Sequence, residues 1–285
     1  MAFQTPIVLI IYNRPEKTRQ VFSMIKCLKP AHLFIIADGG KSEADSLLCN
    51  EARGIIDLVD WDTTLNVNAS DLNLGNAQRT ITGLDWVFEH TNRAIILEDD
   101  CVPHPSFFEF CDTLLQTYAP DEEVMHISGC NLLGTTNTGA SYFFSDYVVP
   151  PWGWATWKRA WQKFNPVMDS WQQHKTEIHP HISQEHFKTW TDTFEYLRLH
   201  KVTWDIPWNI DIWANKGIGI VPSTNLISNI GFDEAATFTK KNHAAYSKLP
   251  VTEMQFPIIH PETKQIHFSK ELEAACIDLL KNLSE

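Results

Sequence analysis

The chain has 285 residues, of which 44% are hydrophobic and 20% are charged, and its formal net charge is −12. A chain of this length and composition can bury a large core, so we expect a globular protein and exclude a disordered or fibrous one. The acidic charge argues against a protein that binds nucleic acid unaided, because such proteins normally present a basic face.

No apolar run approaches the ~20 residues of a membrane-spanning helix. The amino terminus also lacks a basic region followed by an apolar core. We therefore expect a cytoplasmic protein, either free or attached peripherally to a membrane. The six cysteines form no Cys-x-x-Cys pair and have no regular spacing, so neither a disulfide framework nor a zinc site is favoured.

Strand and helix patterns alternate through the first half of the chain. Four apolar runs predict strands, and four stretches with apolar residues at helical spacing predict helices. The predicted strands are Pro6–Tyr12, Leu33–Ala37, Ala94–Leu97 and Val124–Ser128, and the predicted helices are Thr18–Leu28, Ser42–Val59, Ala77–Glu89 and Phe107–Tyr118. Alternation with short connections favours a mostly parallel sheet with right-handed crossovers, flanked by helices.

The pattern is less regular beyond about residue 140. There we expect strands at Tyr142–Val149 and Gly217–Val221, helices at Glu185–Leu199 and Glu271–Leu283, and a mobile polar stretch at 237–248. Because the chain has no internal repeat and no low-complexity linker, we expect residues 1–285 to form one α/β domain with an irregular carboxyl-terminal part.

Three consecutive carboxylates, Glu98, Asp99 and Asp100, directly follow the apolar run Ala94–Leu97. Side chains alternate along a strand, so Glu98 and Asp100 share one face and Asp99 takes the other, unless the backbone bends there. Like charges beside a buried strand are costly unless a cation compensates them, and oxygen ligands suit Mg²⁺ or Mn²⁺. The segment is therefore a candidate metal site; the alternative is a solvated acidic loop.

Two further polar residues follow the first two predicted strands, at the same edge of the sheet. Ligands of open α/β sheets bind at this edge, where Asp38 can accept hydrogen bonds and Arg14 can contact a phosphate or a base. Each also has an ordinary structural explanation, because Asp38 precedes two glycines in a turn and Arg14 precedes a proline on the surface.

A second acidic segment, 204–211, lies among tryptophans and isoleucines. Desolvation by neighbouring indole rings raises the proton affinity of a carboxylate, which is what a general base requires. Asp205 is the first candidate for this role and Asp211 the second. Alternatively, either carboxylate caps or anchors a helix that begins near Pro207.

Four tryptophans occur within residues 152–161. They either pack in the core or present a platform for a sugar or another flat ring, with Trp152 and Trp154 as the candidates for such a platform. Among the twelve histidines, His243 in the polar stretch is the one that we consider as a metal ligand.

Seven motifs occur along the chain in a particular order: PIVLIIYNRP at 6–15, Asp38-Gly39, Asn73-x-Gly75, ILEDDCVPHPSFFEF at 96–110, Ser128-x-x-Asn131, WGWATWKRAW at 152–161 and Trp204-Asp205. The same order is found in GT-A glycosyltransferases. The chain resembles the N-acetylglucosaminyltransferase I family and bacterial glycosyltransferase family 2-like proteins over about residues 5–235. The acidic segment with its prolines and phenylalanines is the most specific of these motifs.

The resemblance implies a nucleotide-binding GT-A fold in which the acidic triplet is a variant of the Asp-x-Asp motif. Asp100 would bind Mn²⁺ or Mg²⁺, Asp99 would lie near the ribose, and Glu98 would lie near the donor sugar. Arg14 and Asp38 would hold the base, usually uracil. Asp205 would deprotonate an acceptor hydroxyl.

The chain departs from related bacterial chains at residues 237–239, which read Thr-Phe-Thr where those chains often carry Thr-His-Thr. The resemblance further implies a nucleotide-binding half at 1–132, an acceptor-side half at 133–250 and a C-terminal extension at 251–285.

The expected activity is metal-dependent transfer of a sugar, with inversion, from a nucleotide-sugar donor such as a UDP-sugar. The acceptor would be a hydroxyl of a bacterial glycan or glycoconjugate, as in polysaccharide biosynthesis. Two alternatives remain. A sugar-nucleotide pyrophosphorylase would normally show a Gly-rich phosphate loop after the first strand, where this chain has Tyr-Asn-Arg-Pro at 12–15. A non-catalytic carbohydrate-binding protein would use the tryptophans.

Overall fold

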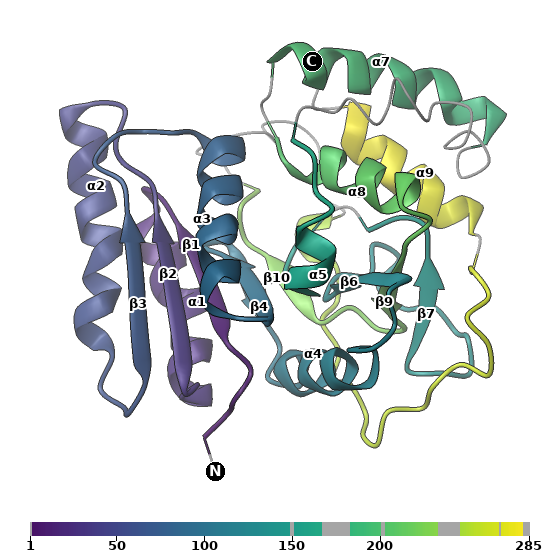
Figure 1. Cartoon of the computed structure of the whole chain (residues 1–285), viewed down its shortest axis with the longest axis horizontal. Coiled ribbons are helices and arrows are strands. Elements are labelled where there is room, and N and C mark those ends of the chain that lie inside the picture. Colours follow the sequence, from purple (N-terminus) through teal and green to yellow (C-terminus); the bar gives the residue numbers. More distant parts are fainter. Residues whose placement is uncertain are drawn as a thin grey trace.

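The computed structural model describes residues 2–148, 151–166, 183–200, 203–232, 246–267 and 269–281. Its strands are β1 (Ile7–Ile11), β2 (His32–Ala37), β3 (Thr64–Ala69), β4 (Arg93–Glu98), β5 (Cys101–Pro103), β6 (Val124–Ser128), β7 (Tyr142–Ser145), β8 (Trp154–Trp157), β9 (Ile218–Pro222) and β10 (Ile227–Asn229). Its helices are α1 (Pro15–Leu28), α2 (Glu43–Arg53), α3 (Asn76–His90), α4 (Ser106–Thr117), α5 (Lys158–Trp161), α7 (Gln184–His200), α8 (Asp205–Ala214) and α9 (Lys270–Lys281), with 3₁₀ turns η1 (Gly54–Leu58) and η3 (Tyr246–Lys248) (Figure 1).

Eight strands form one sheet in the order β3-β2-β1-β4-β8-β6-β9-β7. Strands β1 to β4 pair in parallel, which requires crossovers of the length of α1, α2 and α3. Strand β8 lies antiparallel between β4 and β6, and β7 lies antiparallel at the far edge. The predicted α/β class, with a largely parallel central sheet flanked by helices, is confirmed.

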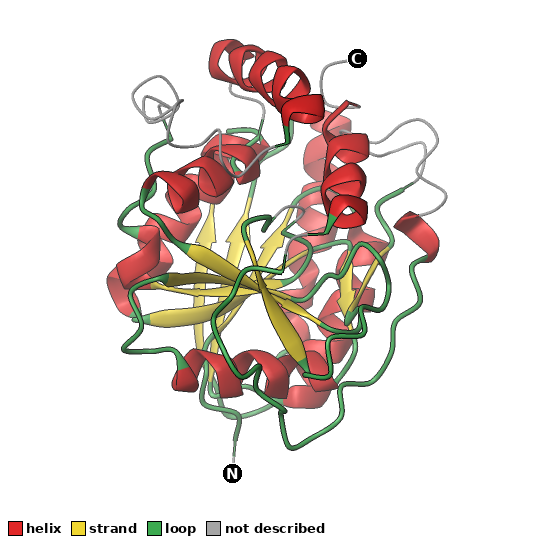
Figure 2. Cartoon of the chain, turned by 90° about the vertical axis from the view of Figure 1, so that its right-hand side faces the viewer, coloured by secondary structure: helices red, strands yellow, loops and turns green. Residues whose placement is uncertain are grey.

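Alternation along β1 explains how the sheet buries both faces. Ile7, Leu9 and Ile11 point to one core, which α1 and α4 cover, whereas Val8 points to a second core, which α3, α5 and α8 cover. Figure 2 shows the strands fanning across one another between the two helical layers, as the right-handed twist of a sheet requires. A third apolar cluster joins α7, α8 and α9 beyond β7.

The predicted strands and helices of the first half are all present, with small differences at their ends. Helix α1 begins at Pro15 rather than Thr18, because proline fits the first turn of a helix. The predicted helix 42–59 divides at Gly54 into α2 and the 3₁₀ turn η1, which agrees with the low helix propensity of glycine.

The sequence patterns did not reveal four strands. Strand β3 is partly exposed at the edge of the sheet and carries a polar sequence. Strand β8 lies in the tryptophan-rich segment and contains Trp154, one of the two candidates for a sugar platform. The three-residue strands β5 and β10 pair only with each other. Most of the stretch 237–248 lies outside the described residues. Within the part of the chain that the structure describes, no helix is long and apolar enough to cross a membrane.

Candidate functional site

The polar residues predicted at the carboxyl ends of β1, β2 and β4 lie at one edge of the sheet. The register aligns Ile11 with Ala37 and Ile10 with Glu98, so the residues that follow each strand are neighbours. This is the edge where ligands bind in open α/β sheets. In Figure 1 it is the upper end of β1 to β4.

The acidic segment bends immediately after β4, where Asp99 and Asp100 form a turn before β5. The turn allows both carboxylates to contact one guanidinium. Nη1 of Arg14 lies 2.7 Å from Oδ2 of Asp100, and Nη2 of Arg14 pairs with Oδ1 of Asp99. The backbone N–H of Tyr12 donates to Asp99 at 3.2 Å. Two of the three successive carboxylates therefore share one cation, which the β1–α1 turn supplies.

Strand β10 and the two residues that follow it contact the acidic turn. The N–H of Ile230 donates to the carbonyl oxygen of Asp100 at 2.8 Å, and Asn229 is paired with Cys101 in the small sheet. A Cβ atom on Gly231 would lie 2.2 Å from Oδ2 of Asp100. Only glycine therefore fits here without displacing the carboxylate.

Glu98, Asp100 and Cys101 each offer a ligand atom, and these atoms all lie within 4.8 Å of one another. The two carboxylates suit Mg²⁺ or Mn²⁺, both of which prefer oxygen ligands. Burial raises the pKa of the Cys101 thiol well above its usual range, and its Sγ donates to Oδ1 of Asp100 at 3.4 Å. The residues present therefore fit a divalent cation held by Glu98 and Asp100.

Burial, together with the charges of Asp100 and Asp99, raises the pKa of Glu98 to about 8, although Arg14 acts in the opposite direction. Burial also raises the pKa of Asp99, and the ion pair with Arg14 opposes that rise. The acidic segment thus carries more negative charge than Arg14 compensates. Carboxylates whose negative charge is not compensated bind either a proton or a cation.

Helix α8 brings Asp205 toward the acidic segment. Asp205 is the first residue of the helix, and Pro207 occupies the first turn, where its missing N–H costs nothing. The Thr203 hydroxyl donates to its Oδ1. Burial raises the pKa of Asp205, and the Thr203 hydrogen bond opposes the rise. The charge of Asp205 also raises the pKa of Glu98, so the two carboxylates lie within electrostatic range of each other.

Asp38 contacts the loop between β3 and α3 with both of its carboxylate oxygens. Oδ1 accepts from the N–H groups of Gly39 and Leu74 at 3.0 and 2.9 Å. Oδ2 accepts from the N–H of Gly75 and the amide of Asn73 at 3.0 and 3.1 Å. Asp38 therefore holds the loop that walls the pocket, and its expected contact with the base stays a prediction.

A pocket opens between this loop and the acidic segment. Its lining includes Tyr12, Arg14, Asp38, Lys41, Asn73, Gly75, Arg79, Glu98 and Asp99. Nζ of Lys41 stands 5.9 Å from the ring centre of Tyr12. Arg79 is buried and donates to the backbone oxygens of Ala37 and Asn68 at 3.2 and 2.5 Å. The pocket therefore joins the predicted nucleotide-binding residues to the acidic triplet.

Two predicted site residues do not belong to this site. Trp154 is fully buried and its ring stacks between His126 and Trp204, so the prediction that it forms a sugar platform is wrong. Asp211 is buried and accepts the backbone N–H of Asn165 at 2.6 Å. It follows Asp205 by six residues, or about 9 Å along the helix axis, and its position agrees with the alternative that it anchors the helix.

Trp152 remains a candidate for contact with a sugar. Its ring is half-buried and meets Phe232 edge to face at 5.3 Å, and Phe232 directly follows Gly231. His243, the candidate histidine ligand, lies outside the described residues. No residue near the site was predicted from β10, because a three-residue strand leaves no periodic pattern.

No family model matches the chain, and no curated protein matches its sequence. Solved structures that are similar include mannose-1-phosphate geranyltransferase from Thermus thermophilus, at 8% identity and a TM-score of 0.39, with 78% of this chain and 74% of that chain covered. UDP-glucose pyrophosphorylase complexed with UDP-glucose is similar at 9% identity and a TM-score of 0.37, over 78% of this chain and 90% of that chain. The function is therefore inferred from the residues of the site.

Proposed function

We propose that this protein is a metal-dependent glycosyltransferase that moves a sugar from a nucleoside diphosphate donor, a UDP-sugar first, to a hydroxyl of a carbohydrate or glycoconjugate. The observation that carries the proposal is the pair of carboxylates, Glu98 and Asp100, whose oxygen atoms lie close enough together to hold a cation. Asp205, from α8, lies within electrostatic range of Glu98, from β4, although 106 residues separate them. The cost of bringing like charges together is offset when the site binds cations and moves a proton.

The nucleotide would occupy the pocket beside Asp38 and Lys41, with the diphosphate toward the acidic segment. Lys41 provides a cation at the pocket, and the Asp38 loop supplies the wall. A divalent cation held by Asp100 and Glu98 would supply the positive charge that stabilises the leaving diphosphate. Arg14 orients both aspartates for this role through its two ion pairs.

Asp205 would act as the general base. Its raised pKa makes the carboxylate a better proton acceptor than an exposed aspartate. It would take the proton of the acceptor hydroxyl, the hydroxyl oxygen would attack the anomeric carbon, and the diphosphate would leave with the bonding electrons. Attack on the face opposite the leaving group gives inversion. Thr203 fixes the carboxylate in place.

The small number of unpaired cations in the pocket favours sugar transfer over nucleotidyl transfer by a pyrophosphorylase. Arg14 is paired with two carboxylates, and Arg79 is bound to backbone oxygens. Of the cations lining the described pocket, this leaves Lys41 for phosphate. A triphosphate substrate carries more negative charge than a diphosphate sugar and would require more free cations.

The first experiment is calorimetric titration with UDP, GDP and CDP, each with and without Mn²⁺. Metal-dependent binding of one nucleotide is expected; binding of carbohydrate alone, without nucleotide or metal, would instead indicate a carbohydrate-binding protein. The activity assay then follows sugar transfer from the matching donor. Formation of nucleoside triphosphate and sugar 1-phosphate from the donor and pyrophosphate would indicate a pyrophosphorylase.

Three variants separate the roles. Asp100→Ala is expected to abolish metal-dependent nucleotide binding. Asp205→Asn is expected to keep binding and lose turnover, by about 10²–10⁴-fold if it is the general base. Asp71→Asn, an exposed carboxylate on the neighbouring loop, is the matched control and should retain both. Full transfer activity in the Asp100 and Asp205 variants would refute the assignment.

A further inference from the structure

A second pocket lies at the other end of the parallel strands, beside their amino-terminal residues. It takes no part in the proposed reaction. It has a volume of about 740 Å³, which is within the usual range for small-molecule sites. His32 and Arg93 begin β2 and β4 there, and Trp157 ends the antiparallel strand β8. It is therefore separated from the acidic segment by the length of the strands.

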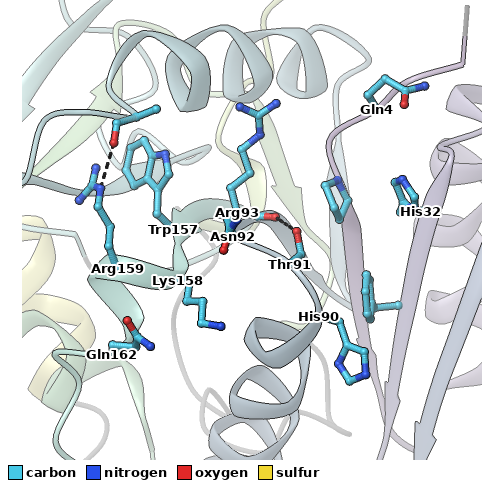
Figure 3. Close-up of a pocket in the computed structure, with 13 residues that line it drawn as sticks. Gln4, His32, His90, Thr91, Asn92, Arg93, Trp157, Lys158, Arg159 and Gln162 are labelled. Atoms are coloured by element: carbon cyan, nitrogen blue, oxygen red, sulfur yellow. Dashed lines mark hydrogen bonds between the residues drawn. The ribbon is translucent and has the colours of Figure 1, made fainter.

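The lining of this amino-edge pocket is basic. Arg93, Lys158 and Arg159 contribute three cations, His32 and His90 add two imidazoles, and no aspartate or glutamate lines it. Figure 3 shows these side chains arranged around the pocket together with Gln4 and Gln162. Such a concentration of positive charge is unexpected in a chain whose formal net charge is −12.

Several cations outside this pocket form ion pairs, whereas Arg53 and Arg79 donate to backbone oxygens. Arg14, Arg19, Lys26 and Lys264 are all paired with carboxylates. Within the described ranges, Arg93, Lys158 and Arg159 have no such partner. Asp121 and Glu122, whose charges act on Arg159, are also paired with Lys264 and Lys163 at 2.9 and 3.2 Å. The described part of the protein therefore compensates these positive charges only in part.

Two of the basic groups are held rigidly. Arg159 lies over the Trp157 ring at 4.4 Å and donates to the carbonyl oxygens of Tyr118 and Ala119 at 3.0 and 3.2 Å. Nδ1 of His90 lies 2.8 Å from the carbonyl oxygen of Trp86; because a carbonyl can only accept, this nitrogen carries the proton and Nε2 is left for another partner.

Hydrogen bonding to the carbonyl groups at helix ends explains the position of only some of these basic residues. Basic groups at helix carboxyl termini satisfy the last carbonyls, which accounts for Arg159 beside α4 and His90 at the end of α3. Arg93 and Lys158 make no such bond with their side chains in the described part of the chain. Both residues line the pocket, and their side chains extend in different directions from its wall (Figure 3).

We propose that the amino-edge pocket binds a phosphate-bearing ligand. Arginine and lysine are the usual phosphate partners, and the apolar side chains of Phe34 and Trp157 line the same pocket and can contact the organic part of the ligand. The site lies away from the acidic segment, so binding there requires neither a divalent cation nor the proposed reaction.

The test uses inorganic pyrophosphate as the probe, titrated calorimetrically in the presence of EDTA, so that metal-dependent binding at the acidic segment does not contribute. Wild-type protein is expected to bind, and Arg93→Gln/Lys158→Gln is expected to bind at least tenfold more weakly. Arg19→Gln/Lys26→Gln removes the same number of positive charges from α1 and should bind like wild type. In addition, pyrophosphate should protect Lys158 from acetylation while leaving the exposed Lys188 reactive.

A second measurement identifies the source of the phosphate. Sedimentation with phosphatidylglycerol vesicles that depends on Arg93 and Lys158 would indicate a lipid headgroup, whereas pyrophosphate binding without sedimentation would indicate a free phosphorylated molecule. Absence of pyrophosphate binding, or equal affinity in both double variants, would overturn the proposal. None of these outcomes depends on transferase activity, so the two proposals can fail separately.

Discussion

Replacing Asp38 by alanine tests how the nucleotide pocket is built. The carboxylate accepts four hydrogen bonds, three of them from the backbone N–H groups of Gly39, Leu74 and Gly75. The side chain is 5% exposed, and the loop approaches so closely that a Cβ on Gly39 would lie 2.6 Å from the carbonyl carbon of Leu72. Asp38→Ala therefore leaves three donors without an acceptor and detaches the loop from β2.

The three N–H groups that lose their acceptor set the expected loss in the free energy of unfolding. A buried donor that loses its partner costs about 1–3 kcal/mol. Because the neighbouring pocket admits water, the low end applies, and three donors give a loss of about 3 kcal/mol in the free energy of unfolding. For a chain of this size about 1 kcal/mol corresponds to about 2–4 °C, so the melting temperature should fall by about 6–12 °C.

Thermal and urea unfolding followed by circular dichroism measure this effect. Asp71→Ala is the matched control, because Asp71 is an exposed carboxylate on the same loop, and it should change stability by no more than about 0.5 kcal/mol. The Asp38 variant should also lose nucleotide affinity at temperatures where it is folded. Equal melting temperatures for the two variants would refute the view that Asp38 organises the loop.

Three other predictions concern single side chains. Gly231→Ala should weaken Mn²⁺ binding at least tenfold by calorimetry, with an unchanged circular dichroism spectrum, because its Cβ would displace Asp100; wild-type affinity would contradict this. Burial lowers the pKa of His126 to about 3 from its ordinary 6.5. Below pH 6.5 the unfolded chain therefore binds a proton at His126 that the folded chain does not bind. Stability should fall as pH drops from 6.5 toward 3, by up to about 1.4 kcal/mol per pH unit, and His126→Gln should lack this component in urea unfolding at several pH values. Gly83→Ala should cost about 1–3 kcal/mol, because its Cβ would lie 2.6 Å from Ile36, whereas Gly54→Ala, with open space around it, should stabilise by about 0.4–1 kcal/mol; equal melting temperatures would contradict the packing argument.

Most of the strands that local patterns predicted correctly are apolar and almost wholly buried. Strands β1, β2 and β4 read as continuous apolar runs and lie in the centre of the sheet. Strand β3 was missed because one side of an edge strand faces solvent, so its sequence carries no strong apolar signal. Apolar sequence therefore predicted buried strands, including β7 at the far edge, but it missed the polar edge strand β3 and the central strand β8.

The tryptophan segment shows where composition misleads. Trp154 was considered for a sugar platform because aromatic rings suit carbohydrates as well as cores. In the structure its whole strand, β8, is inserted between β4 and β6, and the ring is fully buried. Which neighbours a short strand acquires depends on chain segments far away, and no local pattern contains that information.

The sequence by itself determined that Arg14, Asp38 and the acidic triplet lie together, because parallel strands end at one edge and their lengths set the register. Tertiary structure alone decided how these groups are used. It paired Arg14 with Asp99 and Asp100 and bound Asp38 to its loop. It also placed Asp205 within electrostatic range of Glu98 and bonded Asp211 to the backbone of Asn165. Hydrogen bonds and ion pairs depend on distances of a few tenths of an ångström between distant residues, and packing, rather than residue order, sets those distances.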